Sequence, residues 1–422
     1  MSSTTGSVKE SKSSARTGRG LGVGEWLERL DRPVTTYYVL AGVTSILVGF
    51  GLIMVLSAST VTSLNATDSG TAYSIFISQL VFAIIGGVAL IVASRLSVAT
   101  WKRLALPLVG AALVLQVLVF TPLGFDVKGN RNWLDFKVFT MQPSELLKVG
   151  LALSGGLILS AKRKRLNRVG HALVPFVFPL AMLAIGLVLL GHDLGTVLIL
   201  SAVVGGTMFT AGVPGRWFAL SAAGFAAMAV AFVVTSPNRL GRFDVWLGRD
   251  TDPTGMARQS IHGRYALADG GWTGVGLGQS REKWEWLSEP HNDFIFAIIG
   301  EELGLPGTIM VLALFVVLAL ACYRLVMRSS DFFVRIATAG IMSWIVVQAM
   351  INVGSVIGLL PVIGVPLPFV SSGGSSLVTT MLALGILLSF ARAEPGCAKA
   401  LAARPSLLKR SFAVLPRRGS RS

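Results

Sequence analysis

Ten long apolar runs recur along this 422-residue chain, and they constrain its fold more than any other feature. A helix that crosses a bilayer needs about 20 mostly apolar residues. Only helices and closed barrels can cross, because no water satisfies backbone N–H and C=O groups in the hydrocarbon. The runs lie near 37–57, 75–94, 104–121, 144–160, 172–190, 194–211, 217–235, 303–323, 333–358 and 374–391. With 53% hydrophobic and 14% charged residues, the chain is predicted to be an all-α polytopic membrane protein with about ten transmembrane helices.

The placement of lysine and arginine predicts the orientation of these helices, because basic residues in short loops stay cytoplasmic. Lysine and arginine residues follow the second, fourth, sixth and eighth runs and fill both tails. In the loops they are Arg95, Lys102, Arg103, Lys162, Arg163, Lys164, Arg165, Arg168, Arg216, Arg324 and Arg328. Both termini are therefore expected in the cytoplasm, and the formal net charge of +16 is read as an orientation signal that also attracts anionic membrane lipid. Nucleic-acid binding is disfavoured, because no binding module surrounds the scattered basic residues.

Three parts are expected along the chain. Residues 1–30 and 396–422 read as basic cytoplasmic tails, the first of them disordered, and 31–395 as a ten-helix membrane domain with one extracytoplasmic loop at 236–302. The two cysteines, Cys322 and Cys397, offer no disulfide framework and no metal site. A GVGLG string at 274–278 is interpreted as a tight loop, because no βαβ unit follows it.

Four polar clusters fall on the predicted outer face, opposite the basic loops. They are residues 128–148, 191–195, 236–302 and 361–376. In the first cluster, Glu145 and Lys148 are three residues apart and therefore share one face of a helix. Ionisable groups within a membrane usually mark function.

Each cluster also has a purely structural interpretation. Glu145 and Lys148 can neutralise each other, Asp193 can cap the following helix, and Asp252 can open a turn. The serine and glycine run at 371–376 can serve close helix packing. Three tryptophans can be ordinary interfacial anchors: Trp133, Trp284 and Trp286. None of these interpretations explains why all the clusters share one side.

Five separated strings resemble the signature blocks of the SEDS family, the shape, elongation, division and sporulation proteins, which are ten-span peptidoglycan glycosyltransferases. The strings stand in family order over about 30–395: QPSELLK at 142–148, DPTG at 252–255, GVGLGQS at 274–280, EPHNDFIFAIIGEELG at 289–304 and PLPFVSSGGSS at 366–376. Within the expected loop at 236–302 stands the string GRYALADGGWTGVGLGQSREKWEWL, which we call the outer island. This string and the basic tails at both ends of the chain are most similar to the division-type member of high-GC Gram-positive bacteria. The elongation-type member is the near alternative.

The chain departs from the family pattern at four positions. Ser288 stands where the family often has proline, Asn292 where it often has threonine, and Ser372 where tyrosine is more frequent. Arg258 stands before Gln259 where a tyrosine is common. Roles that need those particular side chains are not carried over.

The resemblance implies that lipid II, a disaccharide-pentapeptide on undecaprenyl pyrophosphate, is polymerised with inversion and loss of undecaprenyl pyrophosphate. By its place in the DPTG string, Asp252 is expected to be the general base for the attacking 4-hydroxyl. The expected substrate-binding residues are Trp133, Glu145, Lys148, Arg242, Gln259, Lys283, Glu289, His291, Asp293, Ser371 and Ser375. No cofactor motif is evident. The anionic leaving group needs compensation by basic side chains, Arg249 among the candidates, or by a divalent cation such as Mg²⁺ or Mn²⁺.

The resemblance also implies partners and a location. A class B penicillin-binding protein, whose transpeptidase crosslinks the new glycan, is expected to contact the eighth and ninth runs and the outer island, alongside other division-site proteins. The chain is expected in the bacterial plasma membrane at the division septum. Two other functions stay open: a lipid II flippase, for which the charged residues would line a pathway, and a scaffold that recruits division proteins through its tails.

Overall fold

The computed structural model describes residues 34–402, apart from 67–71, 128, 138, 235, 236, 253, 254, 256 and 285. The expected tail at 1–30 lies outside the described residues. So does the tail at 396–422 except for 396–402, where a short helix forms.

The described elements follow one another as helices with one small sheet. They are α2 (Thr35–Ala66), α3 (Ser74–Arg95), α4 (Val98–Leu118), β1 (Gly124–Val127), β2 (Asn130–Asp135), β3 (Thr140–Met141), α5 (Pro143–Ala161), η1 (Arg163–Arg165), α6 (Val169–Ala172), η2 (Phe176–Ala181), α7 (Met182–Leu190), α8 (Leu194–Ala211), α9 (Gly215–Val234), α10 (Pro237–Trp246), α11 (Arg258–Gly270), α12 (Ile295–Arg328), α13 (Phe332–Val356), α14 (Gly374–Arg392) and α15 (Cys397–Ala402). The three strands form one antiparallel sheet in the order β1-β2-β3.

The all-α membrane fold predicted from the apolar runs is confirmed. Among the described residues, eight helices are long and apolar enough to cross a membrane: α2, α3, α4, α5, α8, α12, α13 and α14. The other two expected spans correspond to the shorter apolar segment Phe176–Leu190 and to α9, which has 20 residues. The count of ten spans stays a prediction.

Two helices begin earlier than the apolar runs indicate, and each start has a physical reason. α4 begins at Val98, where 104 was expected, because the Ser97 side chain accepts from the Thr100 backbone nitrogen and caps the helix. α12 begins at Ile295, where 303 was expected, because residues 294–299 are apolar and buried in the core. The last part of the loop expected at 236–302 is therefore helical.

α12 changes direction at Gly304, whose φ of 65° lies in the left-handed region. The carbonyls of Glu301 and Glu302 accept instead from the backbone nitrogens of Val275 and Gly276, both at 2.9 Å. A Cβ at Gly304 would collide with the backbone of residues 273 and 274. The loop before α12 is thus bonded to the helix along the kink.

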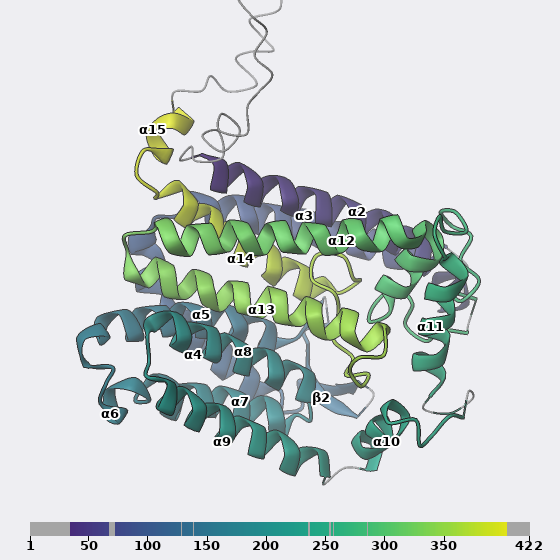
Figure 1. The fold of residues 1–422 in the computed structure, drawn as a ribbon, viewed down its shortest axis with the longest axis horizontal. Helices are drawn as coiled ribbons and strands as arrows, with labels where there is room; N and C mark the ends of the chain where they lie inside the picture. Colours follow the sequence, from purple (N-terminus) through teal and green to yellow (C-terminus); the bar gives the residue numbers. More distant parts are fainter. Residues whose placement is uncertain are drawn as a thin grey trace, which may run out of the picture.

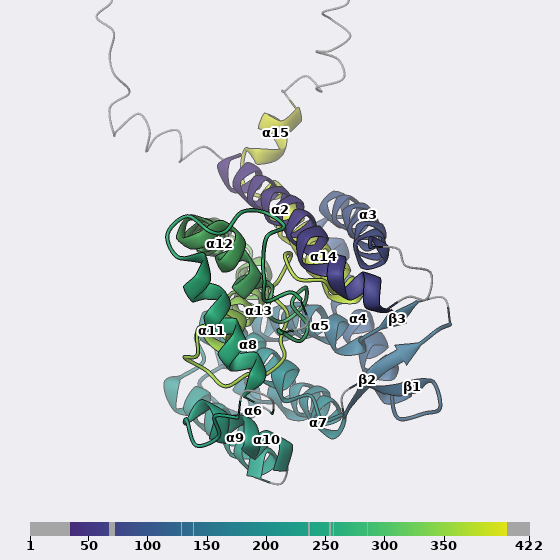
Figure 2. The same ribbon diagram turned by 90° about the vertical axis from the view of Figure 1, so that its right-hand side faces the viewer.

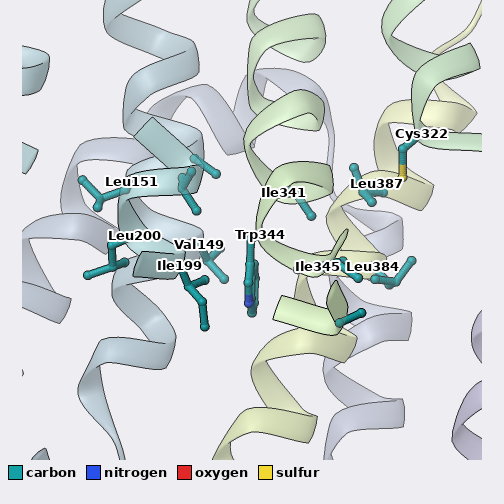
Figure 3. Close-up of a cluster of buried hydrophobic side chains, with 14 of the residues drawn as sticks. Val149, Leu151, Ile199, Leu200, Cys322, Ile341, Trp344, Ile345, Leu384 and Leu387 are labelled. Carbon is teal, nitrogen blue, oxygen red and sulfur yellow. The ribbon is translucent and has the colours of Figure 1, made fainter. Parts of the chain in front are cut away.

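The bundle is built around α5, α13 and α14, the most deeply buried of its candidate spans. α13 packs against α5 and α8, α3 against α14, and α2 against α12. Figure 3 shows Trp344 of α13 between Val149 and Ile199 on one side and Leu384 on the other. Outer helices such as α3 expose apolar side chains, as lipid contact requires.

The polar elements gather at one end of the bundle. Figure 1 shows β2, α10 and α11 at that end and α6 and α15 at the opposite end. Figure 2, which looks onto the first end, shows the three strands on the right-hand side of the bundle and α10 and α11 toward its left. We call this the loop end. The basic segment at 162–168, next to α6, therefore lies away from the expected substrate-binding loops, as the charge pattern predicts.

Candidate functional site

A buried ion pair sits in the first turns of α5. Lys148 Nζ lies 2.7 Å from Glu145 Oε1, and the two side chains are only 1% and 5% exposed. The ammonium also donates to Gln348 Oε1 at 3.2 Å and stands 4.7 Å from the centroid of the Trp344 ring. Thr379 Oγ1 donates to Glu145 Oε2 at 3.2 Å. The pair expected from the i,i+3 spacing is therefore formed, inside the bundle rather than on a lipid face.

A second carboxylate, that of Asp193, belongs to the same cluster. It caps α8, because Oδ1 accepts from the Thr196 backbone nitrogen at 2.9 Å and Oδ2 from the Thr196 hydroxyl at 2.7 Å. Gln142 Nε2, just before α5, donates to Asp193 Oδ2 at 2.8 Å. The charges of Lys148 and Glu145 act on Asp193. The expected capping role is thus present together with a place beside the ion pair.

The loop between α13 and α14, residues 357–373, closes over the segment 289–294. Ser371 Oγ donates to Asn292 O at 2.7 Å, and the Ser372 backbone nitrogen donates to His291 O at 2.9 Å. We call residues 357–373 the α13–α14 loop. It brings together the two segments that carry Ser371 and His291, through the Ser371 hydroxyl and the backbone of residues 291, 292 and 372.

Two further expected residues lie at the edges of this contact. Glu289 has a positive φ of 59°, and its Oε2 stands 3.9 Å from His291 Nε2. Ser375, in the first turn of α14, accepts from Thr379 Oγ1 through its carbonyl at 2.8 Å. The same hydroxyl stands 3.2 Å from Glu145 Oε2, so its one proton lies between the two oxygens and joins the start of α14 to the buried ion pair.

Lys283 has a different setting from the one expected. Its ammonium donates to Gly278 O at 2.6 Å and lies 3.4 Å from both Ser57 O and Glu302 Oε1. A lysine has three donors, and each has an oxygen here. Ser57 Oγ also donates to the Glu302 carboxylate at 2.7 Å. In this arrangement Lys283 fastens the loop between α11 and α12, which we call the outer loop (residues 271–294), to α2 and α12.

Glu301 is a functional candidate that the sequence motifs did not single out. Its carboxylate is fully buried and accepts from Ser280 Oγ and the Arg281 backbone nitrogen, each at 2.6 Å. Two consecutive glutamates in an otherwise apolar helix were the available signal. Glu301 shapes the loop that follows α11.

His262 of α11 pairs with the carboxylate of Glu282, which lies in the loop after that helix. His262 Nδ1 lies 2.8 Å from Glu282 Oε2, and the imidazole stacks on Trp286 with ring centroids 5.6 Å apart. Burial raises the pKa of Glu282 above its ordinary value, against the opposing effect of the His262 hydrogen bond. Gln259 Nε2 donates to Ser288 O at 3.4 Å on the same helix. These contacts fasten α11 to the segment 280–288.

Asp252, the expected base, lies on the segment between α10 and α11 and is exposed. Its carbonyl accepts from the Gly255 backbone nitrogen at 3.3 Å, which agrees with the turn that was the structural interpretation. Its own backbone nitrogen donates to Asp250 Oδ1 at 3.1 Å. The buried ion pair and the exposed Asp252 therefore have opposite solvent environments.

The remaining candidates occupy the loop end. Arg242 of α10 donates to Val362 O at 3.2 Å and so joins α10 to the α13–α14 loop. Arg249 Nη1 lies 3.3 Å from Asp244 Oδ1. Trp133 on β2 is half-buried, with its ring centroid 6.5 Å from that of Phe125.

Asp293 presents its main chain to α13. Its carbonyl accepts from Asn352 Nδ2 at 2.7 Å. Across the part of the chain that the structure describes, no group of three or more His, Cys, Asp or Glu side chains is arranged to hold a metal ion. The protein groups present thus do not fit a resident cation.

The chain is similar to known proteins over most of its length. It is 40% identical over 381 residues to the probable peptidoglycan glycosyltransferase FtsW of Mycobacterium tuberculosis, covering 90% of this chain and 72% of that protein. It is 36% identical over 359 residues to the stage V sporulation protein E of Bacillus subtilis, covering 84% and 96%.

Solved structures give the same result for the fold. A chain from a peptidoglycan synthase complex that coordinates polymerization and crosslinking superposes with a TM-score of 0.67 at 26% identity, covering 84% of this chain and 97% of that one. The rod shape determining protein RodA of Thermus thermophilus superposes with a TM-score of 0.63 at 23% identity, covering 85% and 97%. The protein is thus a multi-pass membrane protein, and the resemblance stated from its motifs is confirmed. Residues 38–395 match the cell cycle protein family that is named after FtsW, RodA and SpoVE, and the chain belongs to that family.

Proposed function

We propose that this protein is a peptidoglycan glycosyltransferase that polymerises lipid II for septal wall synthesis. The observation that carries the proposal is the buried ion pair of Glu145 and Lys148 with Asp193 beside it, set under the segments that contain the family motifs. Intramembrane charges of this kind are costly and mark substrate sites. The relatives named as probable peptidoglycan glycosyltransferases add support.

The reaction asks for a base and for charge compensation. Asp252 takes the proton of the acceptor 4-hydroxyl, and the oxygen of that hydroxyl bonds to the anomeric carbon of the growing strand. The bond from that carbon to the pyrophosphate oxygen breaks, and undecaprenyl pyrophosphate leaves with the electron pair. A positioned carboxylate contributes about 10²- to 10⁴-fold to such a step. An exposed carboxylate on a turn suits this role because substrate can reach it.

Lys148 is the cation proposed for the leaving group. Two of its three donors meet Glu145 and Gln348, which leaves one for a phosphate oxygen. Glu145 Oε1 lies 2.7 Å from the ammonium and offsets part of the cost of burying its charge. Arg242 and Arg249 on and after α10 are further candidates at the loop end. A divalent cation carried in with the pyrophosphate stays a prediction.

A hollow on the flank of α7 suits the lipid portion of the substrate. Its volume is about 430 Å³, and its lining is apolar apart from one histidine: Met182, Leu183, Gly186, Leu187, Leu189, Leu190 and His192. Because Asp193 directly follows His192, the hollow borders the charged cluster. A polyprenyl chain lying there would bring its pyrophosphate toward Lys148.

A class B penicillin-binding protein is the proposed partner, with other division-site proteins around it. The synthase complex to which the fold is similar coordinates polymerization with crosslinking, which supports a transpeptidase beside this chain. We place the complex in the plasma membrane at the septum, with both termini cytoplasmic.

A flippase is the second candidate, favoured by the burial of the charged cluster within the bundle. One experiment separates the two functions. The purified protein with its partner transpeptidase is given lipid II in detergent, where the substrate is accessible from every side, and the glycan products are run on a gel. Polymer that persists in moenomycin, which excludes a contaminating polymerase, supports the glycosyltransferase, and absence of polymer from an intact complex contradicts it.

A further inference from the structure

Gln348 of α13 joins three parts of the bundle through one buried amide. Its Oε1 accepts from Trp344 Nε1 at 2.7 Å and from Lys148 Nζ at 3.2 Å, while its Nε2 donates to Pro366 O at 2.9 Å. The residue is 1% exposed. These partners fix the direction of the amide, because the reversed amide would set its NH₂ against two donors.

The same face of α13 makes a second contact with the α13–α14 loop. Asn352, four residues after Gln348, donates through Nδ2 to Val365 O at 2.7 Å and to Asp293 O at 2.7 Å. Two consecutive loop carbonyls, those of Val365 and Pro366, are therefore held by two amides one helical turn apart. The ammonium of Lys148 is thus connected through Gln348 to the loop that covers the segment 291–293.

The two oxygens that accept hydrogen bonds from Lys148 are not equivalent. Glu145 Oε1 is charged and lies at 2.7 Å, whereas Gln348 Oε1 is neutral and lies at 3.2 Å. A charge-assisted hydrogen bond is roughly twice as strong as a neutral one. An arriving phosphate oxygen would therefore accept from the third N–H of Lys148, whose direction is set by the bonds to Glu145 and Gln348, and the weaker bond to Gln348 would be the first to lengthen. Gln348 would still be held by Trp344 and Pro366.

We propose that Gln348 is a positioning residue that aims the Lys148 ammonium at the pyrophosphate and transmits occupancy of that site to the α13–α14 loop. The inference rests on the proposed function, because it takes pyrophosphate as the ligand of Lys148. Gln348 itself touches neither the reacting carbon nor the attacking hydroxyl in this assignment.

The chain offers a matched control in Gln79 of α3. This glutamine is also buried and holds the same loop, since Nε2 donates to Ser371 O at 3.2 Å and Oε1 accepts from the Gly373 backbone nitrogen at 3.1 Å. Its amide is not among the acceptors of Lys148, which are Glu145 and Gln348, so Gln79→Met loosens the loop without removing an acceptor from the ammonium. Comparison of Gln348→Met with Gln79→Met separates coupling from general loosening.

The test is hydrogen exchange of residues 362–373 in the full chain, with and without inorganic pyrophosphate. We expect pyrophosphate to change the exchange in wild type and in Gln79→Met, and to leave it unchanged in Gln348→Met. With the partner present, Gln348→Met should raise KM for lipid II about 10-fold or more, as the loss of a hydrogen bond to a charged group does, while Gln79→Met should leave KM unchanged. A normal response in Gln348→Met, an equal loss in Gln79→Met, or no response in wild type would overturn the proposal.

A second variant guards against misfolding, because Gln348→Met leaves the Trp344 N–H without its acceptor. Gln348→Glu keeps an oxygen for Trp344 and Lys148, but its carboxylate competes with pyrophosphate for the ammonium. Pyrophosphate affinity should fall at least about 10-fold, and an unchanged affinity contradicts the proposal. The coupling and the polymerase activity can fail separately. Polymer formation without a response of the loop contradicts only the coupling, and a response of the loop without polymer contradicts only the polymerase activity.

Discussion

Glu302 of α12 and Lys283 of the outer loop form an ion pair inside the protein, with Oε1 and Nζ 3.4 Å apart and side chains 0% and 4% exposed. Breaking such a pair leaves a buried charge uncompensated. We expect Lys283→Met to lower the free energy of unfolding by about 3–5 kcal/mol, measured by thermal unfolding in detergent.

The exposed pair of Lys102 and Asp331 provides the control, because its atoms are closer, at 2.6 Å, but both side chains are 38% exposed. Lys102→Met should cost less than about 1 kcal/mol. The double variant Lys283→Met with Glu302→Gln should recover part of the loss. Equal costs for the two lysines would show that burial is not what makes the Lys283 pair important.

Asp252→Asn tests the proposed base. The carboxamide has the same size and sits on an exposed turn, so folding and partner binding should be unchanged, whereas polymerisation should fall at least about 10²-fold. Glu289→Gln and Asp293→Asn serve as controls and should lose less. Polymer from purified Asp252→Asn at the wild-type rate, in the presence of moenomycin, would remove Asp252 from the reaction. A flippase instead predicts impaired exposure of lipid II in this variant and no polymer from wild type.

The pair in α5 separates stability from catalysis. Lys148→Met and Glu145→Gln should each destabilise the protein, because each leaves the other group buried without its partner, and the double variant should recover part of the loss. Lys148→Met and the double variant should each lose about 10²- to 10³-fold in turnover, the usual cost of removing one group that stabilises transition-state charge. Normal turnover by a well-folded Lys148→Met would exclude pyrophosphate from this site.

The raised pKa of the Glu282 carboxyl predicts that the stability of the segment 280–288 depends on pH. Burial raises its pKa above the ordinary 4.5, and the charges of Glu301 and Asp269 act in the same direction. A raised pKa favours the protonated form in the folded state, so this contribution to stability is complete below about pH 4.5 and is lost as the pH rises through the raised value. Hydrogen exchange of 280–288, corrected for its intrinsic rate, should become faster over that range in wild type, and Glu282→Gln should flatten the dependence. An opposite slope would contradict the assignment.

The orientation can be tested with single cysteines in a chain whose Cys322 and Cys397 have been replaced. Positions 164 and 288 are both exposed and lie in segments expected on opposite sides of the membrane. An impermeant maleimide applied to intact cells should label position 288 and spare position 164. Labelling of position 164 from outside would reverse the predicted topology.

Local features of the sequence predicted local features of the structure. The spacing of Glu145 and Lys148 predicted their pairing, because residues three apart on a helix are neighbours whatever surrounds them. The capping role of Asp193 followed from the same kind of pattern. The apolar runs located the helices, but they misplaced the start of α12, since Glu301 and Glu302 interrupt the apolar run after the first turns of that helix.

Contacts between distant segments were beyond the sequence. Gln348 is 200 residues from Lys148 along the chain, and no periodicity within α13 indicates which helix its amide will face. Lys283 was expected to bind substrate, and one sequence does not show that its ammonium has oxygen partners inside the protein. Its partners, Ser57 and Glu302, come from two different helices and are brought together only by the tertiary fold.

The kink at Gly304 has a consequence for biosynthesis. The backbone nitrogens of Val275 and Gly276 find their acceptors on α12, at residues that the ribosome adds more than two dozen positions later. Because a chain is made from its N-terminus onward, the outer loop has to wait, incompletely folded, until α12 has entered the membrane. A substitution at Gly304 should therefore appear first as a defect of assembly, seen as protease-sensitive newly made protein, before any effect on the finished enzyme can be measured.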